Sequence, residues 1–118
     1  MSEPQDPAAG CAASLQALSK RAPRVHCLTN PVALTLSANA LLAVGARPSM
    51  TTDPEQVGDF IAASQALCVN LGMLDDVRRR AIDAALDAAA AHGVPWVLDP
   101  VKVNLSAKRL AYARDLLA

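Results

Sequence analysis

The chain carries its most reactive side chains in the short stretch "RVHCLTNP" near the N-terminus. His26, Cys27, Thr29 and Asn30 lie within five consecutive positions, and Pro31 follows directly. Residues of these types can form a thiol nucleophile with an imidazole base, a metal site, or the polar end of a buried strand that faces a ligand. Which of these three kinds of site is present depends on the strands and helices that position the side chains.

Strand alternation argues against a nucleophile–base pair. Residues 25–28 are apolar at both ends and precede a Thr-Asn-Pro turn signal, so we expect a strand. Because neighbouring side chains of a strand point to opposite faces, His26 and Cys27 cannot pair with each other. A single buried cysteine also serves far more often as a small hydrophobic residue than as a nucleophile. We therefore do not favour catalytic roles for His26, Cys27 or Cys68.

The composition predicts one folded domain with an aliphatic core. The chain has 118 residues, of which 53% are hydrophobic, 19% charged and 3% aromatic. Lys and Arg together number 11, as do Asp and Glu, so the net charge offers no attraction for nucleic acid or for an anionic membrane surface. No apolar run approaches the roughly 20 residues that span a bilayer. We expect neither nucleic acid nor a membrane as a partner.

The N-terminal segment and the cysteines predict a cytoplasmic protein. Residues 1–10, MSEPQDPAAG, hold two acidic residues, two prolines and no basic residue, which is unlike a signal peptide, so we expect a flexible tail. The three cysteines are widely spaced and include no CxxC pair. They predict reduced thiols and disfavour a structural zinc site.

Helical and strand patterns alternate along the chain. Helices are predicted over residues 11–22, 31–44, 54–64, from 75 or 76 to 92, and 106–117. Strands are predicted over residues 25–28, 48–50, 66–71 and 96–98. This alternation predicts an α/β fold of three layers, with a mainly parallel sheet between two layers of helices. The expected N-terminal caps are Asn30, Asp53, Asp75 or Asp76, and Ser106, and the expected C-terminal caps are Gly45 and Gly93.

Two helices carry a specific prediction about burial. The helix over residues 31–44 has no charged residue between Pro31 and Ala46, so we expect it to be largely buried. The helix that ends at His92 has a charged side that we expect to face solvent. Its members are Arg78, Arg79, Arg80, Asp83 and Asp87.

Polar or backbone-exposing residues follow each of the four predicted strands. Open α/β sheets bind ligands outside the carboxyl ends of their strands, so these residues predict a site at that edge. They are Thr29-Asn30, Met50-Thr51, Asn70-Leu71-Gly72 and Asp99. The sequence contains no GxGxxG, P-loop or HExxH pattern, which disfavours the standard dinucleotide, P-loop and zinc-protease sites.

Each of these residues has a structural alternative. Asn30 is suited to hold a polar heterocycle or simply to cap a helix. Met50 is suited to pack against a flat ligand or to fill the core. Gly72 lets a ligand approach the backbone closely or only makes a turn. Asp99 is suited to hold Mg²⁺ near phosphates or to close an Asp-Pro turn.

Four segments together resemble a known family. They are "VHCLTNPVALTLSANALLAVGARPSM", "DPEQV", "ALCVNLGML" and "GVPWVLDPV". Over residues 15–118 the chain resembles the N-terminal half of the hydroxyethylthiazole kinase family, which has a ribokinase-like fold. The resemblance implies ATP- and Mg²⁺-dependent phosphorylation of the hydroxyl of 4-methyl-5-(2-hydroxyethyl)thiazole in thiamine biosynthesis and salvage. It also implies a homotrimer with thiazole sites between subunits.

The resemblance assigns roles to the residues at the strand ends. Met50, Asn30 and Gly72 match positions that line the thiazole site, and Asp99 of the LDPV motif matches the position near the magnesium and the phosphates. The arginine that contacts ATP and the catalytic residues are expected beyond Ala118. We therefore expect residues 11–118 to form the N-terminal part of a ribokinase-like kinase domain, and the isolated chain to be inactive.

One segment departs from the family pattern. The LDPV motif continues as "KVNLSAKR", where the family has a glycine-containing loop, so Lys102 or Lys108 can replace backbone contacts with charge. Arg109 lies too early to be the arginine that contacts ATP. The alternative to a kinase is a non-catalytic α/β remnant that binds small ligands or subunits. An unrelated nucleotide-binding α/β domain is the third hypothesis.

Overall fold

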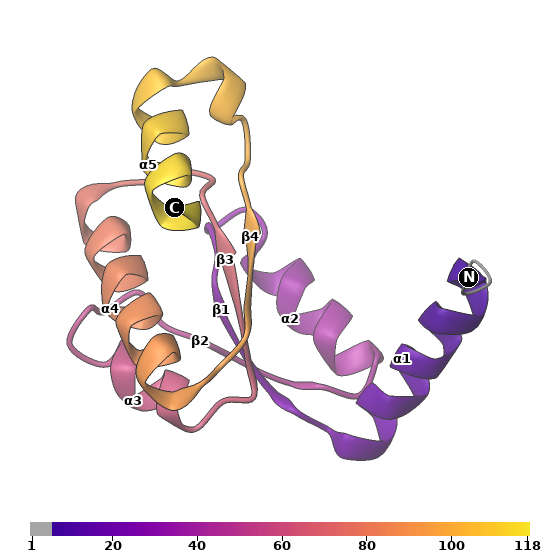
Figure 1. The fold of residues 1–118 in the computed structure, drawn as a ribbon. Coiled ribbons are helices and arrows are strands. Elements are labelled where there is room, and N and C mark those ends of the chain that lie inside the picture. The colour runs from indigo at the N-terminus through magenta and orange to yellow at the C-terminus, as the bar shows by residue number, and fades with distance from the viewer. Residues whose placement is uncertain (1–5) are drawn as a thin grey trace.

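The computed structural model describes residues 6–118 and confirms the predicted alternation of helices and strands (Figure 1). The strands are β1 (Arg24–Leu28), β2 (Arg47–Met50), β3 (Ala66–Asn70) and β4 (Trp96–Asp99). The helices are α1 (Pro7–Arg21), α2 (Leu34–Ala43), α3 (Val57–Ala62), α4 (Asp76–His92) and α5 (Ala107–Leu117), with a short 3-10 helix η1 (Val103–Leu105) before α5. None of the helices within residues 6–118 has the length and hydropathy that crossing a membrane requires.

The four strands form one parallel sheet in the order β2-β1-β3-β4. Helices α1 and α2 lie on one side of the sheet, and α3, α4 and α5 lie on the other (Figure 1). The predicted three-layer α/β fold with a parallel sheet is therefore confirmed. The register places Cys27 opposite both Met50 and Cys68, and it places Asn70 opposite Asp99.

The main core lies between the sheet and helices α3, α4 and α5. Alternate residues of β3, Leu67 and Val69, enter this core, where they join Val57, Ile61 and Ile82 from the helices. The opposite face of the sheet carries only a small buried cluster, Val25, Cys27 and Ala46. The α3–α5 side therefore supplies most of the burial that stabilises the fold.

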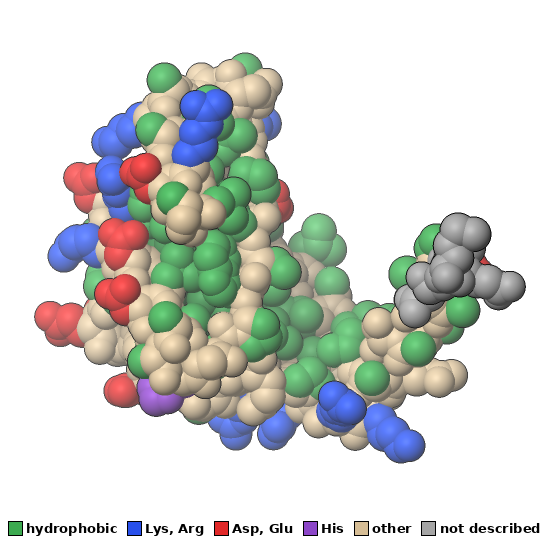
Figure 2. All heavy atoms as spheres, in the orientation of Figure 1, with side chains coloured by type: hydrophobic (Ala, Val, Ile, Leu, Met, Phe, Trp, Pro, Cys, Tyr) green, Lys and Arg blue, Asp and Glu red, His purple; other side chains and the backbone are tan. Residues whose placement is uncertain are grey.

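The predicted burial of the helix over residues 31–44 is wrong for this chain. No residue of α2 is buried, and the exposed fractions of Leu36 and Leu42 are 73% and 58%. Hydrophobic side chains gather over α1 and α2, whereas charged side chains gather on the outer side of α4 and α5 (Figure 2). An apolar sequence indicates that a helix tends to be buried. Within residues 6–118, however, the outer side of α2 stays exposed.

Three helices begin elsewhere than predicted. Helix α1 begins at Pro7, where Asp6 Oδ1 accepts a hydrogen bond from the Ala8 N–H, so residues 7–10 of the predicted flexible tail are helical. Residues 1–5 of that tail lie outside the described residues. Helices α2 and α3 begin after single turns, because Asn30 and Asp53 bind the amides of these turns before the regular helix forms.

The other predicted caps depend on local chemistry alone and are confirmed. Asp75 Oδ1 accepts from the Arg78 N–H at 2.8 Å, and Ser106 Oγ accepts from the Arg109 N–H at 3.2 Å. Gly93 ends α4 with φ 66°, a left-handed conformation that suits glycine. Gly45 follows Val44 and closes α2, because its N–H donates to the Leu42 carbonyl at 3.1 Å and the Ala46 N–H donates to the Leu41 carbonyl at 2.9 Å. Gly45 has φ 93°, and an added Cβ would lie 2.7 Å from the Ser19 Cα.

Candidate functional site

A chain of hydrogen bonds joins three strand ends at the carboxyl edge of the sheet. Asn30, Asn70 and Asp99 lie at the ends of β1, β3 and β4, which are neighbours in the sheet. Asn30 Nδ2 donates to Asn70 Oδ1 at 2.9 Å, and Asn70 Nδ2 donates to Asp99 Oδ2 at 3.1 Å. The parallel register makes this chain possible because it brings the three side chains to one edge. The predicted convergence of polar residues is present at these three strand ends.

Asn30 uses its amide both as a cap and as a link. Its Oδ1 accepts hydrogen bonds from the Val32 and Ala33 N–H groups at 3.0 and 3.1 Å, so Asn30 caps the turn that precedes α2 and not α2 itself, whose N-cap is Ala33. Its Nδ2 holds Asn70, and the residue is only 9% exposed. An amide nitrogen carries two N–H groups, and the hydrogen bond to Asn70 uses one of them.

Gly72 makes room for the link between the two asparagines. An added Cβ would lie 2.6 Å from Asn30 Nδ2 and 2.9 Å from Asn70 Oδ1. The Gly72 N–H also donates to Asn70 Oδ1 at 2.9 Å. A side chain at position 72 would therefore occupy the place of the Asn30–Asn70 hydrogen bond. This is a third reason for the glycine, besides the ligand approach and the turn that the sequence suggested.

Asp99 presents an exposed carboxylate at the same edge. Its Oδ2 accepts the hydrogen bond from Asn70, and its carbonyl accepts from the N–H groups of Leu71 and Val101. Among residues 6–118 no group of three or more His, Cys, Asp or Glu side chains is arranged to hold a metal ion. Mg²⁺ commonly binds one or two carboxylates together with substrate phosphates and water, so a single Asp99 carboxylate fits this ion.

Met50 lies apart from the hydrogen-bonded residues. It ends β2, an outer strand of the sheet, and packs half-buried against the cluster of Val25, Cys27 and Ala46. This packing corresponds to the core alternative for Met50. The contact with a flat ligand stays a prediction.

A cavity of about 340 Å³ opens beside this edge, between the sheet and α2. We call it the α2 cavity. Asn70 and Asp99 line its polar end, and Cys27, Cys68 and Leu41 are among the residues that line the rest. Cavities that bind small molecules usually measure about 300 to 1,000 Å³ and are mainly apolar with a few polar groups, so the α2 cavity is large enough for a small ligand.

The sequence alone did not identify the roles of two residues at this site. The first is Asn70, which accepts two hydrogen bonds on Oδ1 and donates one, so it is the centre of the chain. Its position after an apolar run is a usable signal, because a polar residue at the end of a buried strand needs partners. The signal does not name those partners, because they come from other strands.

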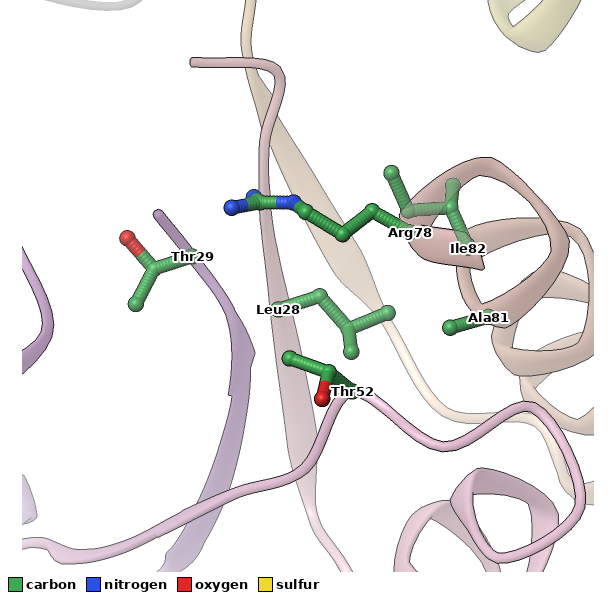
Figure 3. Close-up of a pocket in the computed structure, with 6 residues that line it drawn as sticks. All are labelled: Leu28, Thr29, Thr52, Arg78, Ala81 and Ile82. Carbon is green, nitrogen blue, oxygen red and sulfur yellow. The ribbon is translucent and has the colours of Figure 1, made fainter. Parts of the chain in front are cut away.

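The second residue is Arg78, for which the predicted solvent exposure is wrong. It is 8% exposed, and its Nη2 donates to the Asn70 carbonyl at 3.2 Å. Figure 3 shows the guanidinium extending from α4 toward Thr29. Its Nη1 is buried without a partner among residues 6–118, beside a cavity of about 10 Å³, room for about one water molecule. Burial lowers the pKa of Arg78, an effect that Asp75 opposes and Arg109 reinforces.

His26 and Cys27 lie on opposite faces of the sheet, as strand alternation predicted. His26 is fully buried, its Nδ1 lies 2.7 Å from Ser49 Oγ, and its ring centroid lies 5.2 Å from that of Phe60 on the α3 side. Burial lowers the pKa of His26 to about 4, so the imidazole is neutral near pH 7. Cys27 belongs to the cluster on the other face. The absence of a nucleophile–base pair between them is confirmed.

The known proteins that we compare with this chain are named as hydroxyethylthiazole kinases. The model of the hydroxyethylthiazole kinase family matches residues 15–118. A probable hydroxyethylthiazole kinase of Agrobacterium fabrum is 45% identical over 111 residues, which cover 94% of this chain and 45% of that protein. The hydroxyethylthiazole kinase of Kineococcus radiotolerans is 48% identical over 112 residues, which cover 95% of this chain and 41% of that protein.

A solved structure agrees with the sequence matches. The structure of hydroxyethylthiazole kinase protein from Pyrococcus horikoshii superimposes with a TM-score of 0.86 and 36% identity, over 89% of this chain and 41% of that one. This agreement is consistent with the ribokinase-like fold that the resemblance implies. The chain spans less than half the length of these relatives. The match over residues 15–118 nevertheless covers most of this chain, which therefore belongs to the hydroxyethylthiazole kinase family.

Proposed function

We propose that this chain supplies the thiazole-binding part of a kinase that transfers phosphate from ATP to the hydroxyl of hydroxyethylthiazole. The family membership supports the reaction, and the relatives carry this substrate in their names. The observation that carries the proposal is the hydrogen-bonded chain from Asn30 through Asn70 to Asp99. It links a residue of the proposed substrate site to the residue of the proposed metal site.

The proposed thiazole site consists of Asn30, Gly72 and Met50. Asn30 has one amide N–H available, and a hydrogen bond from it suits a ring nitrogen or a hydroxyl oxygen. The missing side chain of Gly72 leaves room for the hydrogen bond that fixes the Asn30 amide against Asn70. The soft thioether of Met50 suits a flat aromatic ring. Together they offer one polar contact and one apolar contact to a small heterocycle.

Asp99 is the proposed ligand of Mg²⁺. When bound, the ion would neutralise negative charge on the phosphates during transfer. The hydrogen bond from Asn70 orients the Asp99 carboxylate. Arg109 does not take the role of an ATP contact here, because its Nη1 donates to the Val101 carbonyl at 2.9 Å and supports the loop after β4.

The proposal also covers the catalytic groups, the oligomeric state and the cellular location of the protein. The resemblance supports an ATP-contacting arginine and catalytic residues outside positions 1–118, so we propose that residues 1–118 alone do not transfer phosphate. The exposed apolar side of α2 supports contacts between subunits, as in the homotrimer that the resemblance implies, since such contacts would remove Leu36 and Leu42 from water. The free cysteines support a cytoplasmic location.

Binding and phosphate transfer are tested separately. Isothermal titration of the chain with hydroxyethylthiazole should give binding that Asn30→Ala and Met50→Ala weaken. Asn104→Ala, at an exposed asparagine in η1, is the matched control and should leave binding unchanged. Equal affinity in wild type, Asn30→Ala and Met50→Ala would remove the proposed thiazole site.

Sequencing of the genomic DNA beyond the codon for Ala118 tests the alternative of a non-catalytic α/β remnant. If the reading frame continues, the whole translated product should phosphorylate hydroxyethylthiazole with ATP, and the 118-residue chain should not. A stop codon there, with thiazole binding retained, favours the remnant. Phosphate transfer by the 118-residue chain itself would contradict the proposal that the catalytic groups lie elsewhere.

A further inference from the structure

Cys27 and Cys68 form a pair on the sheet face that lines the α2 cavity. They are register partners on the neighbouring parallel strands β1 and β3. Adjacent strands lie about 4.8 Å apart, and paired residues project their side chains from the same face. Both cysteines are free, and both line the α2 cavity. The two thiols are therefore close neighbours that share one opening.

The two thiols change each other's chemistry. Hydrogen bonding from the Cys27 thiol lowers the pKa of Cys68 to about 7, even though burial opposes the shift. The same hydrogen bond and burial raise the pKa of Cys27. Near neutral pH Cys68 is therefore the thiol of the pair that ionises more readily, and Cys27 stays neutral beside it. A thiolate is the form of cysteine that attacks electrophiles and binds metals.

The surroundings restrict which ligands the pair can take. His26 lies on the other face of the sheet, and no group of three or more His, Cys, Asp or Glu side chains within residues 6–118 can hold a metal ion. A four-ligand zinc site is therefore not formed by these residues. A direct disulfide requires Cβ atoms about 3.5–4.5 Å apart, which is shorter than the usual spacing of parallel strands. A bridging atom between the two sulfurs spans the strand spacing more easily.

The cavity beside the sulfurs is apolar along much of its wall. Ala40 and Leu41 come from α2, and Val97 comes from β4. Cys68 is half-buried and Cys27 is buried, so a reagent first meets Cys68. An apolar group attached to the bridging atom would lie against α2, within the 340 Å³ of the cavity.

We propose that Cys27 and Cys68 form a two-thiol site for a thiophilic centre that accepts two sulfur ligands, namely trivalent arsenic bearing an aryl group. An aryl arsonous acid, ArAs(OH)₂, reacts with the two thiols to give ArAs(S-Cys)₂ and two water molecules. Two As–O bonds break, two As–S bonds form, and the thiol protons leave with the hydroxyl groups. Arsenic stays trivalent, so no oxidant or reductant is consumed.

A ligand bound to Cys27 and Cys68 would lie in the cavity that extends to the carboxyl ends of the strands. Cys68 lies two residues before Asn70 on β3, and the α2 cavity is lined by both thiols as well as by Asn70 and Asp99. A bridged arsenical therefore occupies the same cavity that leads to the Asn30–Asn70–Asp99 chain. The inference does not depend on the proposed kinase activity, because it concerns only the two thiols and the cavity.

The test uses phenylarsine oxide, which hydrates to an aryl arsonous acid, on the reduced 118-residue chain. Intact-mass measurement after a subsequent iodoacetamide treatment should show one bound arsenical and one alkylated thiol, since the chain has three cysteines and two are protected. A small 1,2-dithiol should remove the arsenical. Cys27→Ser and Cys68→Ser should each weaken binding about 100-fold or more, because a second ligand on the same chain acts at high effective concentration.

Cys11→Ser is the control, because Cys11 is exposed on α1 and should not affect the arsenical. Peptide mapping of the wild-type adduct gives the same answer without relying on variants, since the protected peptides should contain positions 27 and 68. Protection of Cys11, three alkylated thiols after saturation with the arsenical, or wild-type affinity in either Cys27→Ser or Cys68→Ser would each overturn the proposal.

Discussion

Asn30 Nδ2 donates a hydrogen bond to Asn70 Oδ1 at 2.9 Å, and this bond joins the carboxyl ends of β1 and β3. The two asparagines are 40 positions apart in the sequence. The same Oδ1 accepts the Gly72 N–H, and the amide nitrogen of Asn70 holds Asp99. Asn30 of the proposed substrate site and Asp99, the proposed metal ligand, therefore both form hydrogen bonds with the side chain of Asn70.

Replacement of Asn70 tests this central role. Asn70→Ala leaves the Asn30 amide and the Gly72 N–H without their acceptor, so we expect a loss of about 1–3 kcal/mol in the free energy of unfolding. Urea unfolding measures this loss, and Asn104→Ala at an exposed position should have little effect. An Asn70→Ala variant as stable as wild type would show that water replaces the lost partners without cost.

A methyl group at position 72 should break the same link. The added Cβ of Gly72→Ala would lie 2.6 Å from Asn30 Nδ2, so the amide must move and its bond to Asn70 should be lost. We expect a destabilisation of about 1–3 kcal/mol. Gly10→Ala is the matched control, because its Cβ meets nothing within 4 Å in α1 and should stabilise the protein by about 0.5–1 kcal/mol. Equal effects of the two substitutions would contradict the steric argument.

The buried Arg78 should contribute little to stability despite its hydrogen bond. Its charge lies in the first turn of α4, near the positive end of the helix, and its Nη1 lacks a partner within residues 6–118. Arg78→Met keeps the apolar stem and removes the buried charge, so we expect the free energy of unfolding to stay the same or rise by about 1 kcal/mol. Arg80→Met, at an exposed position of the same turn, controls for the change in net charge.

Thermal or urea unfolding of the two arginine variants distinguishes the outcomes. A loss of more than about 3 kcal/mol in Arg78→Met alone, the cost of breaking a buried ion pair, would mean that Arg78 is held by further partners, such as a bound water or anion.

The stability of the protein should fall in mild acid because of His26. Its pKa is lowered to about 4 in the folded chain by burial, against an ordinary value of 6.5. The unfolded state therefore binds a proton first, so this contribution is fully present above pH 6.5 and is lost as the pH falls from 6.5 to 4. The largest loss from this group is about 3 kcal/mol.

A non-titrating side chain should remove this pH dependence. In His26→Gln the difference in unfolding free energy between pH 7.5 and pH 4.5 should be smaller than in wild type by about 2–3 kcal/mol. His92→Gln, at an exposed histidine, should behave like wild type. If His26→Gln keeps the wild-type difference, another group is responsible.

Several features of this fold could be predicted because they depend on nearby residues. The alternation of strands and helices follows from hydrophobic pattern, and the caps at Asp75, Ser106 and Gly93 follow from side chains and backbone within a few positions. The predicted starts of α2 and α3 lie a turn too early, since the same capping chemistry also stabilises isolated turns.

The sequence by itself determined the α/β class, the strand alternation that separates His26 from Cys27, and the strand ends at which Asn30, Gly72 and Asp99 lie. Only the tertiary structure decided the order β2-β1-β3-β4, and with it the meeting of Asn30 with Asn70 and of Cys27 with Cys68. The physical reason is that the first set depends on contacts between residues near in sequence. The second set depends on which strands become neighbours, and that is decided by packing across the whole chain.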